Sequence, residues 1–259
     1  MTEPPRIVLH IGAPKTGSTY LQKRLRIAPQ VLRRHGIYVP VLPVVARMAG
    51  NAKLLPVALD RDPSPSFRRA FPGIDVSGLD PAQVAAALIA DWRSERETLL
   101  LSAENFRLHH AQEVRDLLPA GVSCAVVLFV RRQDDWVDSY YNQLIKTQDI
   151  HEDIGSFVAR LCDTVRDSTC RPDWHAHHRA WSDAFGRCEV VFYDEVRSDL
   201  FAAFLAAAGL EPIPELPEIE RAQVSLDIYQ LAYLLQLEKE TAFPEFARRR
   251  AAGEEASRR

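Results

Sequence analysis

A lysine and several hydroxyl side chains lie together near the N-terminus, in a segment of small residues. The segment consists of Lys15, Thr16, Gly17, Ser18 and Thr19. It follows an apolar run that is typical of a buried strand, and it precedes apolar residues at helical spacing. A helix N-terminus presents free backbone N–H groups and the positive end of the helix dipole, so it binds anions. This pattern indicates a phosphate-binding loop; an ordinary turn with a solvated lysine is the alternative.

The position of the lysine separates two kinds of phosphate loop. The nucleoside triphosphate loop G-x-x-x-x-G-K-[ST] has its lysine directly after the second glycine. Here Ser18 follows Gly17, and the lysine stands two residues before that glycine. The segment from Pro14 to Thr19 instead resembles the 5′-phosphosulfate loop of sulfotransferases that use 3′-phosphoadenosine 5′-phosphosulfate (PAPS) and release 3′-phosphoadenosine 5′-phosphate (PAP).

An arginine and a serine form a second set of candidate binding residues. Arg131 follows the most apolar segment of the chain, so we expect it at the carboxyl end of a strand, where open α/β sheets bind ligands. Ser139 lies eight residues further on, on the polar side of an expected helix. A solvated arginine and a surface serine would explain either residue alone. The run from Arg131 to Tyr141, however, resembles the 3′-phosphate-binding motif of the same sulfotransferase family.

The resemblance extends over roughly residues 6 to 210 and implies a role for each matching residue. The loop residues 15–19 would hold the 5′-phosphosulfate, and Lys15 would assist the leaving group. Arg131 and Ser139 would hold the 3′-phosphate, for which a guanidinium offers a bidentate contact. Cytosolic small-molecule members also have an Arg-Lys-Gly segment near the C-terminus. Residues 211–240 lack it, so the adenine contacts and the rest of the 3′-phosphate site stay unassigned.

A carboxylate is expected beside the loop. Residues 98–102 predict a buried strand, and Glu104 follows it. Because parallel strands end at one edge of a sheet, we expect Glu104 near Lys15 and Arg131. The family places His or Glu after the corresponding strand, Glu more often in its carbohydrate and tyrosyl branches, which implies a general base for an acceptor hydroxyl. An exposed carboxylate, or an ion-pair partner of Lys15, is the alternative.

The elements that must position these residues alternate along the chain. Expected helices cover residues 18–27, 29–36, 80–96, 111–118, 134–147, 152–163, 172–185 and 198–208, and expected strands cover residues 7–11, 98–102, 122–130 and 189–193. This alternation predicts an α/β fold: a mostly parallel sheet of four to five strands with helices on both faces. The family resemblance implies that this fold is similar to that of P-loop NTPases.

We expect residues 1–259 to form a single domain. Within it, residues 41–79 are rich in proline and are expected to be irregular, with a short helix near 44–50. They are interpreted either as a lid or acceptor-binding wall, or as a surface excursion. Another helix is expected at 224–239. The Arg/Glu/Ala-rich tail, 247–259, is expected to be frayed or disordered.

Composition limits the partners. The net charge is −3, from 32 basic and 35 acidic residues, so no global electrostatic field favours nucleic acid.

No run approaches the ~18 apolar residues of a membrane span, and the N-terminus lacks a signal-peptide pattern. The four cysteines form no C-x-x-C pair, which is typical of reduced residues in a cytoplasmic protein. The histidine groups at 109–110 and 175–178 lack a further ligand at metal-like spacing, so no metal is expected.

The sequence therefore predicts an enzyme that transfers a sulfuryl group from PAPS to a hydroxyl of a carbohydrate or small-molecule acceptor. A P-loop kinase of small molecules is one alternative, although it would need a lysine after the second loop glycine. A non-catalytic nucleotide-binding protein of the same fold is the other.

Overall fold

The computed structural model describes residues 4–42, 51–60, 78–147, 150, 152–163, 173–219 and 230. Its contacts divide the chain into two compact units. The first contains Met1–Trp136 and Thr164–Ala222, and the second contains Val137–Asp163 and Gln223–Arg259.

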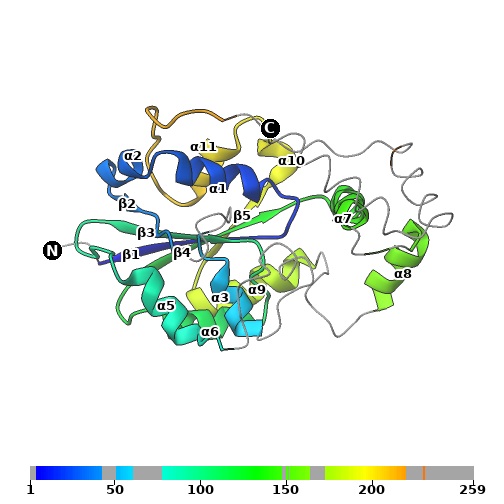
Figure 1. Cartoon of the computed structure of the whole chain (residues 1–259), viewed down its shortest axis with the longest axis horizontal. Helices are drawn as coiled ribbons and strands as arrows, with labels where there is room; N and C mark the ends of the chain where they lie inside the picture. The colour runs from blue at the N-terminus through cyan, green and yellow to red at the C-terminus, as the bar shows by residue number, and fades with distance from the viewer. Residues whose placement is uncertain are drawn as a thin grey trace, which may run out of the picture. The chain divides into compact units, whose positions relative to one another are not determined.

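A five-stranded parallel sheet forms the centre of the first unit (Figure 1). The strand order is β2-β3-β1-β4-β5, and every pairing is parallel, which confirms the predicted fold class. The strands are β1 (Arg6–Gly12), β2 (Ile37–Tyr38), β3 (Thr98–Ala103), β4 (Ser123–Val130) and β5 (Cys188–Phe192).

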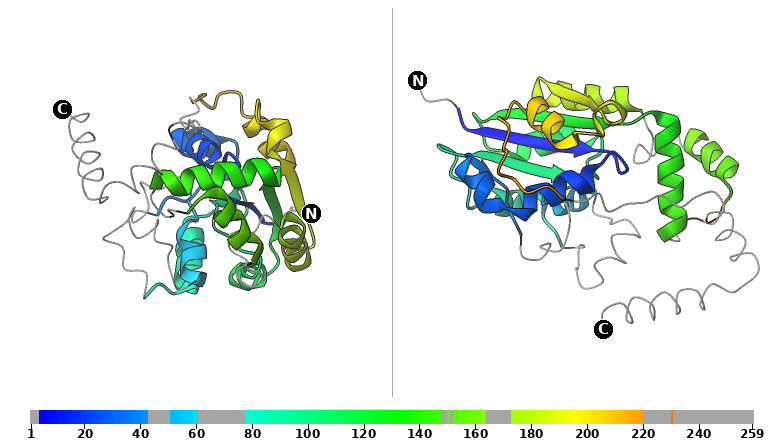
Figure 2. Two further views of the ribbon diagram at one scale, coloured as in Figure 1. Left: turned by 90° about the vertical axis from the view of Figure 1, so that its right-hand side faces the viewer. Right: turned by 90° about the horizontal axis from the view of Figure 1, so that it is seen from above.

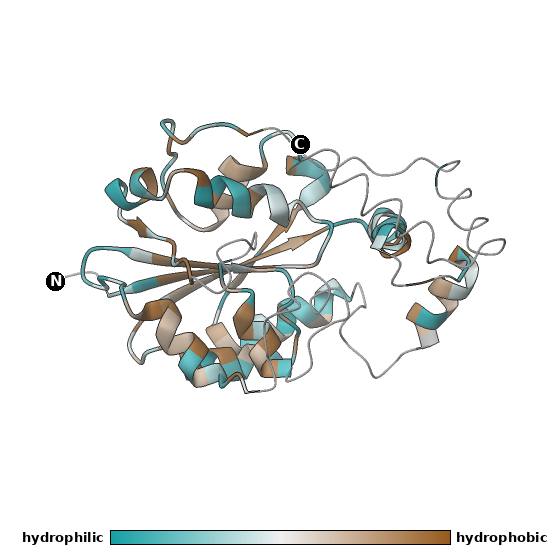
Figure 3. Ribbon diagram, viewed as in Figure 1, coloured by the Kyte–Doolittle hydropathy of each residue, from teal (hydrophilic) through white to brown (hydrophobic). Residues whose placement is uncertain are grey.

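Helices cover both faces of this sheet (Figure 2). On one face, Ile7, Leu9 and Ile11 pack with the helices α3 (Leu54–Asp60), α5 (Pro81–Ile89), α6 (His110–Leu117) and α9 (Trp174–Phe185). On the other face lie α1 (Ser18–Ile27), α2 (Pro29–Arg34), α10 (Tyr193–Val196) and α11 (Leu200–Ala207). The strands are therefore apolar on both sides, and Figure 3 shows the centre of the sheet in brown, the hydrophobic colour.

The second unit contains most of α7 (Gln133–Thr147), which begins in the first unit, and α8 (Ile154–Asp163). The Tyr141 hydroxyl donates a hydrogen bond of 2.9 Å to the Glu152 carbonyl. The rings of Tyr141 and Phe157 lie 5.3 Å apart between centroids. These contacts join α7 to α8.

The structure corrects two expected elements. The helix predicted over 80–96 ends at Ile89. Beyond it, the Glu97 carboxylate accepts a hydrogen bond from the backbone N–H of Arg93 and pairs with Arg33. These contacts stabilise a non-helical turn at residues 93–97, so the helix does not continue. The expected irregular segment 41–79 contains α3, whose Pro56 lies in the first turn, where a missing N–H is tolerated.

Three expectations lie outside the described residues: the short helix at 44–50, the tail at 247–259 and nearly all of the helix at 224–239. In the part of the chain that the structure describes, no helix combines the length and apolar character needed to cross a membrane.

Candidate functional site

The loop between β1 and α1 has an unusual backbone. Lys15 has a φ of 69° and Gly17 a φ of 84°, both in the left-handed region. A non-glycine residue held there costs about 1–3 kcal/mol and is found preferentially at functional sites. At Gly17 no side chain fits, since a Cβ would lie 2.5 Å from Leu200 Cδ2 and 2.9 Å from Tyr193 Cε2. The loop is therefore closely packed, and Lys15 is held at a strained position.

The loop side chains divide into an inner and an outer group. Thr16 and Ser18 are buried, and the Thr16 hydroxyl donates a hydrogen bond of 2.7 Å to the Ala13 carbonyl. The two hydroxyl oxygens lie 3.3 Å apart. Lys15 and Thr19 are partly exposed. The inner hydroxyls thus support the loop from beneath, and the outer residues face the site.

Glu104 directly follows β3 and lies beside the outer residues. It accepts a hydrogen bond from the Thr19 hydroxyl. Burial raises the pKa of the Glu104 carboxyl above its ordinary value of 4.5, while Lys53, Lys15 and the Thr19 hydrogen bond partly oppose that effect. The structure therefore brings Glu104, Lys15 and Thr19 together, and it adds Lys53.

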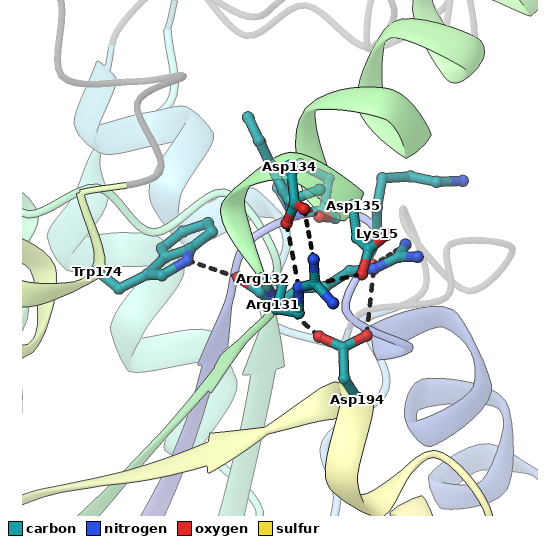
Figure 4. A network of polar contacts seen from close by, with 9 residues as sticks. Lys15, Arg131, Arg132, Asp134, Asp135, Trp174 and Asp194 are labelled. Carbon is teal, nitrogen blue, oxygen red and sulfur yellow. Dashed lines mark hydrogen bonds and ion pairs between the residues drawn. The ribbon is translucent and has the colours of Figure 1, made fainter.

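Arg131 directly follows β4 and reaches the same loop. Its Nη1 lies 3.4 Å from the Lys15 carbonyl oxygen and donates to it. Its Nε lies 3.6 Å from Asp194 Oδ1, and its guanidinium lies over the Tyr193 ring, 5.4 Å from the centroid. Figure 4 shows Asp194 in contact with both Arg131 and Arg132. Lys15 and Arg131, which are 116 positions apart, thus belong to one site.

Two tryptophans hold the backbone at Arg131 and next to Lys15 through hydrogen bonds. Trp136 Nε1 donates a hydrogen bond of 2.8 Å to the Pro14 carbonyl. Trp174 Nε1 donates one of 2.7 Å to the Arg131 carbonyl (Figure 4). The two rings meet edge to face at 5.7 Å between centroids. The indoles therefore couple the loop after β1 to the end of β4.

Ser139 lies on α7, half-buried, in the part of that helix that belongs to the second unit. Its role at a 3′-phosphate stays a prediction.

Sequence reasoning missed Lys53, Tyr193 and Asp194 as residues of the site. The rule that pointed to Glu104 and Arg131 would have found Tyr193 and Asp194, because they directly follow β5. Lys53 has no such signal, since it follows no strand.

A buried polar network lies beneath the loop. His10 Nδ1 lies 2.7 Å from Ser102 Oγ, and Gln22 Nε2 donates to that oxygen at 3.2 Å. Which of His10 and Ser102 donates in their hydrogen bond depends on the His10 tautomer. His10 Nε2 is buried, has no hydrogen-bond partner among the described residues, and lies 3.3 Å from where a Cβ on Gly12 would be. His10 must therefore stay neutral.

This network predicts a loss of stability in acid. Burial lowers the pKa of His10 from 6.5 to about 3. As the pH falls below 6.5, the unfolded chain takes up a proton that native His10 does not, so stability present above pH 6.5 is lost towards pH 3. We expect His10 alone to lower the free energy of unfolding by about 2 kcal/mol between pH 7 and pH 5, measured by urea titration. Burial of His177, with a pKa of about 4, acts in the same direction.

The His10→Gln variant should lose less stability than the wild type over this range, whereas His175→Gln, at an exposed position on α9, should behave like the wild type. An equal loss in all three proteins would contradict the assignment. If His10→Gln does not fold, an NMR titration of the His10 ring in the wild type tests the same assignment. The ring should stay neutral at pH 5.

Asp60 lies beside His109 and His110, the adjacent histidines noted in the sequence. One ligand atom from each of Asp60, His109 and His110 lies within 4.8 Å of the others. Arg107 Nε lies 3.0 Å from Asp60, and the Arg107 backbone N–H donates to His110 Nδ1 at 3.1 Å. His110 therefore donates to Asp60 through Nε2, at 2.8 Å. These contacts join the end of α3 to the segment that follows Glu104.

Comparison with known proteins shows the fold. No family model and no curated protein matches the sequence. The sulfotransferase from Alicyclobacillus acidocaldarius is similar over 84% of this chain and 87% of its own, with a TM-score of 0.52 and 17% identity. The chain therefore has a sulfotransferase-like fold, of the P-loop-like α/β type.

Two further solved structures are similar at lower TM-scores. Retinol dehydratase, in complex with androsterone and inactive cofactor PAP, matches 89% of this chain and 63% of its own, at 14% identity and a TM-score of 0.41. A gluconokinase from Sinorhizobium meliloti 1021 matches 79% and 92%, at 12% identity and a TM-score of 0.36.

Proposed function

We propose that this protein transfers a sulfuryl group from PAPS to a hydroxyl of a carbohydrate or small-molecule acceptor. The observation that carries the proposal is the meeting of Lys15, Glu104 and Arg131 at one edge of the sheet. Lys15 and Glu104 interact electrostatically, and Arg131 contacts the Lys15 backbone. A loop of the sulfotransferase type, a strand-end arginine and a carboxylate are thus combined in one site.

The residues present fit a ligand that is anionic at two positions. The loop offers the N-terminus of α1 and the Lys15 charge to one anion. The Arg131 guanidinium, held by Asp194 and Tyr193, offers N–H donors to another. The 5′-phosphosulfate is assigned to the loop, where Lys15 and Thr19 face the site and the buried Thr16 and Ser18 hydroxyls support the loop. The 3′-phosphate is assigned to Arg131, with Ser139 predicted to contribute.

When bound, PAPS supplies the sulfuryl group: the acceptor oxygen bonds to sulfur, the bond from sulfur to the bridging oxygen breaks with its electron pair left on the phosphate, and the hydroxyl proton is released. Glu104 accepts that proton, for which its raised pKa is suited, because a base is most effective when its pKa approaches the working pH. Lys15 stabilises the negative charge that grows on the phosphate.

The test is calorimetric titration with PAP. We expect PAP to bind without Mg²⁺ and ATP not to bind under the same conditions, whereas a small-molecule kinase would bind Mg²⁺-ATP. The Arg131→Ala variant should bind PAP about 30- to 5,000-fold more weakly, the range for losing one partner of a buried charged contact.

The matched control is Arg187→Ala, at an exposed arginine that pairs with Glu189 on β5. It should bind PAP as the wild type does. If Arg131→Ala also binds PAP with unchanged affinity, Arg131 does not hold the 3′-phosphate. Labelled-sulfate transfer to a panel of hydroxyl compounds then separates an enzyme from a non-catalytic nucleotide-binding protein.

A further inference from the structure

The outer edge of β3 is completed by a side chain. β2 pairs with β3 only at Thr98 and Leu99. Further along the same edge, Asn51 takes the place of a strand: its Nδ2 donates to the Leu100 carbonyl at 2.8 Å, and its Oδ1 accepts the Ser102 N–H at 2.7 Å. The Ala52 N–H donates to the Ser102 carbonyl at 3.2 Å. These hydrogen bonds fix residues 51–53 at the carboxyl end of β3.

Lys53 is thereby held beside Glu104. Lys53 directly follows Ala52, whose N–H is hydrogen-bonded to the Ser102 carbonyl, and Glu104 lies two residues after Ser102. Of the charged groups that act on Glu104, Lys53 has the largest effect, ahead of Lys15. The far end of α3 is also fixed, through the contacts of Asp60 with Arg107 and His110. The backbone that carries Lys53 is therefore fixed on both sides, next to the carboxyl end of β3.

The strand order places Lys53 on the side of the site away from the donor residues. Across the edge the order is Lys53, Glu104, Lys15, Arg131, because residues 51–53 flank β3 and the other three residues follow β3, β1 and β4. The donor is assigned to the loop after β1 and to Arg131. An acceptor hydroxyl that reaches Glu104 must therefore come from the side of Lys53.

The Lys53 ammonium can bind an anion there. Lys53 is half-buried, and within the described ranges its ammonium makes no hydrogen bond. An ammonium has three N–H donors, and a partly buried charge gains most from an oppositely charged partner. An acceptor group bound by it would lie next to the hydroxyl that is presented to Glu104.

We infer that Lys53 forms an anion subsite for the acceptor, and that the acceptor carries a carboxylate, phosphate or sulfate group close to the hydroxyl that is sulfated. This inference rests on the proposed function. It narrows the acceptor class from hydroxyl compounds in general to anionic ones, such as acidic sugars or phosphorylated metabolites.

The experiment compares matched probes on the protein saturated with PAP. Methyl glucuronide and methyl glucoside share one ring and differ in the charge at C6, and glucose 6-phosphate serves as the phosphate probe. We expect at least one anionic probe to bind about 10- to 100-fold more tightly than methyl glucoside, the range for a hydrogen bond to a charged group. Binding is measured because loss of the Lys53 charge also acts on Glu104 and would change transfer rates.

Lys53→Met should abolish the preference for the anionic probe, and Lys53→Arg should keep most of it. Lys23→Met, at an exposed position on α1, should keep all of it. The inference is overturned if no anionic probe is preferred, or if Lys53→Met prefers the same probe as strongly as the wild type does. Failure of PAP to bind would overturn the proposed function itself, whereas PAP binding without a charge preference would overturn only the anion subsite.

Discussion

Replacing Glu104 by glutamine is expected to lower the rate of sulfuryl transfer about 10²- to 10⁴-fold, the range for loss of a positioned acid–base group. The amide has nearly the same shape and can still accept the hydrogen bond from Thr19, so the fold should be kept. It has no carboxylate to take the hydroxyl proton. The measurement is kcat with labelled PAPS, with a thermal melt to check the fold.

The pH profile gives an independent readout for the same residue. Glu104 accepts a proton only when it is ionised, and its pKa is raised above 4.5. Wild-type transfer should therefore fall as the pH drops through a pKa above that value, and the residual rate of Glu104→Gln should lack this acidic limb. Glu113→Gln, at an exposed position on α6, should show the wild-type rate and profile. If the Glu104→Gln enzyme shows the wild-type rate and the wild-type pH profile, Glu104 is not the general base.

Lys15→Met is expected to lower kcat about 10²- to 10³-fold, which is typical of removing one group that stabilises charge in the transition state. Methionine keeps the length and the apolar stem of the side chain but leaves the departing phosphate without its cation. Single-turnover measurements of labelled-sulfate transfer check this, since they separate the chemical step from product release.

The left-handed backbone of Lys15 allows charge and strain to be separated. Lys15→Gly removes the charge and also the cost of a side chain at a φ of 69°, so it should be as slow as Lys15→Met while its melting temperature does not fall. Lys15→Arg keeps the charge and should be the fastest of the three variants. If Lys15→Met transfers sulfate at the wild-type rate, Lys15 does not assist the leaving group.

Much of the fold could be predicted because its signals are local. Apolar runs such as Ile7–Ile11 and Val126–Val130 mark strands that are buried on both faces, and their alternation with helices defines a parallel sheet. The exact pairing partner of β2 and the helix α3 were not predictable. α3 depends on tertiary contacts of a proline-containing segment with the core, which propensity does not register.

The candidate site was predictable where a residue directly follows a strand, as Glu104 and Arg131 do. The two tryptophans and Lys53 were not, because each acts through a contact between distant parts of the chain. Trp136 and Trp174 hold backbone carbonyls that no periodicity reveals. Lys53 acts on Glu104 only because Asn51 replaces a length of strand. The roles of Lys15, Glu104 and Arg131 remain predictions that the experiments above address, and the role of Ser139 also remains a prediction.

The attachment by Asn51 bears on how such an enzyme can diversify. One amide satisfies both the Leu100 carbonyl and the Ser102 N–H, so the edge of β3 next to Glu104 is completed by the Asn51 side chain and needs no further strand. Retention of this single asparagine is therefore enough to keep residues 51–53 beside Glu104 while other residues on the acceptor side are changed.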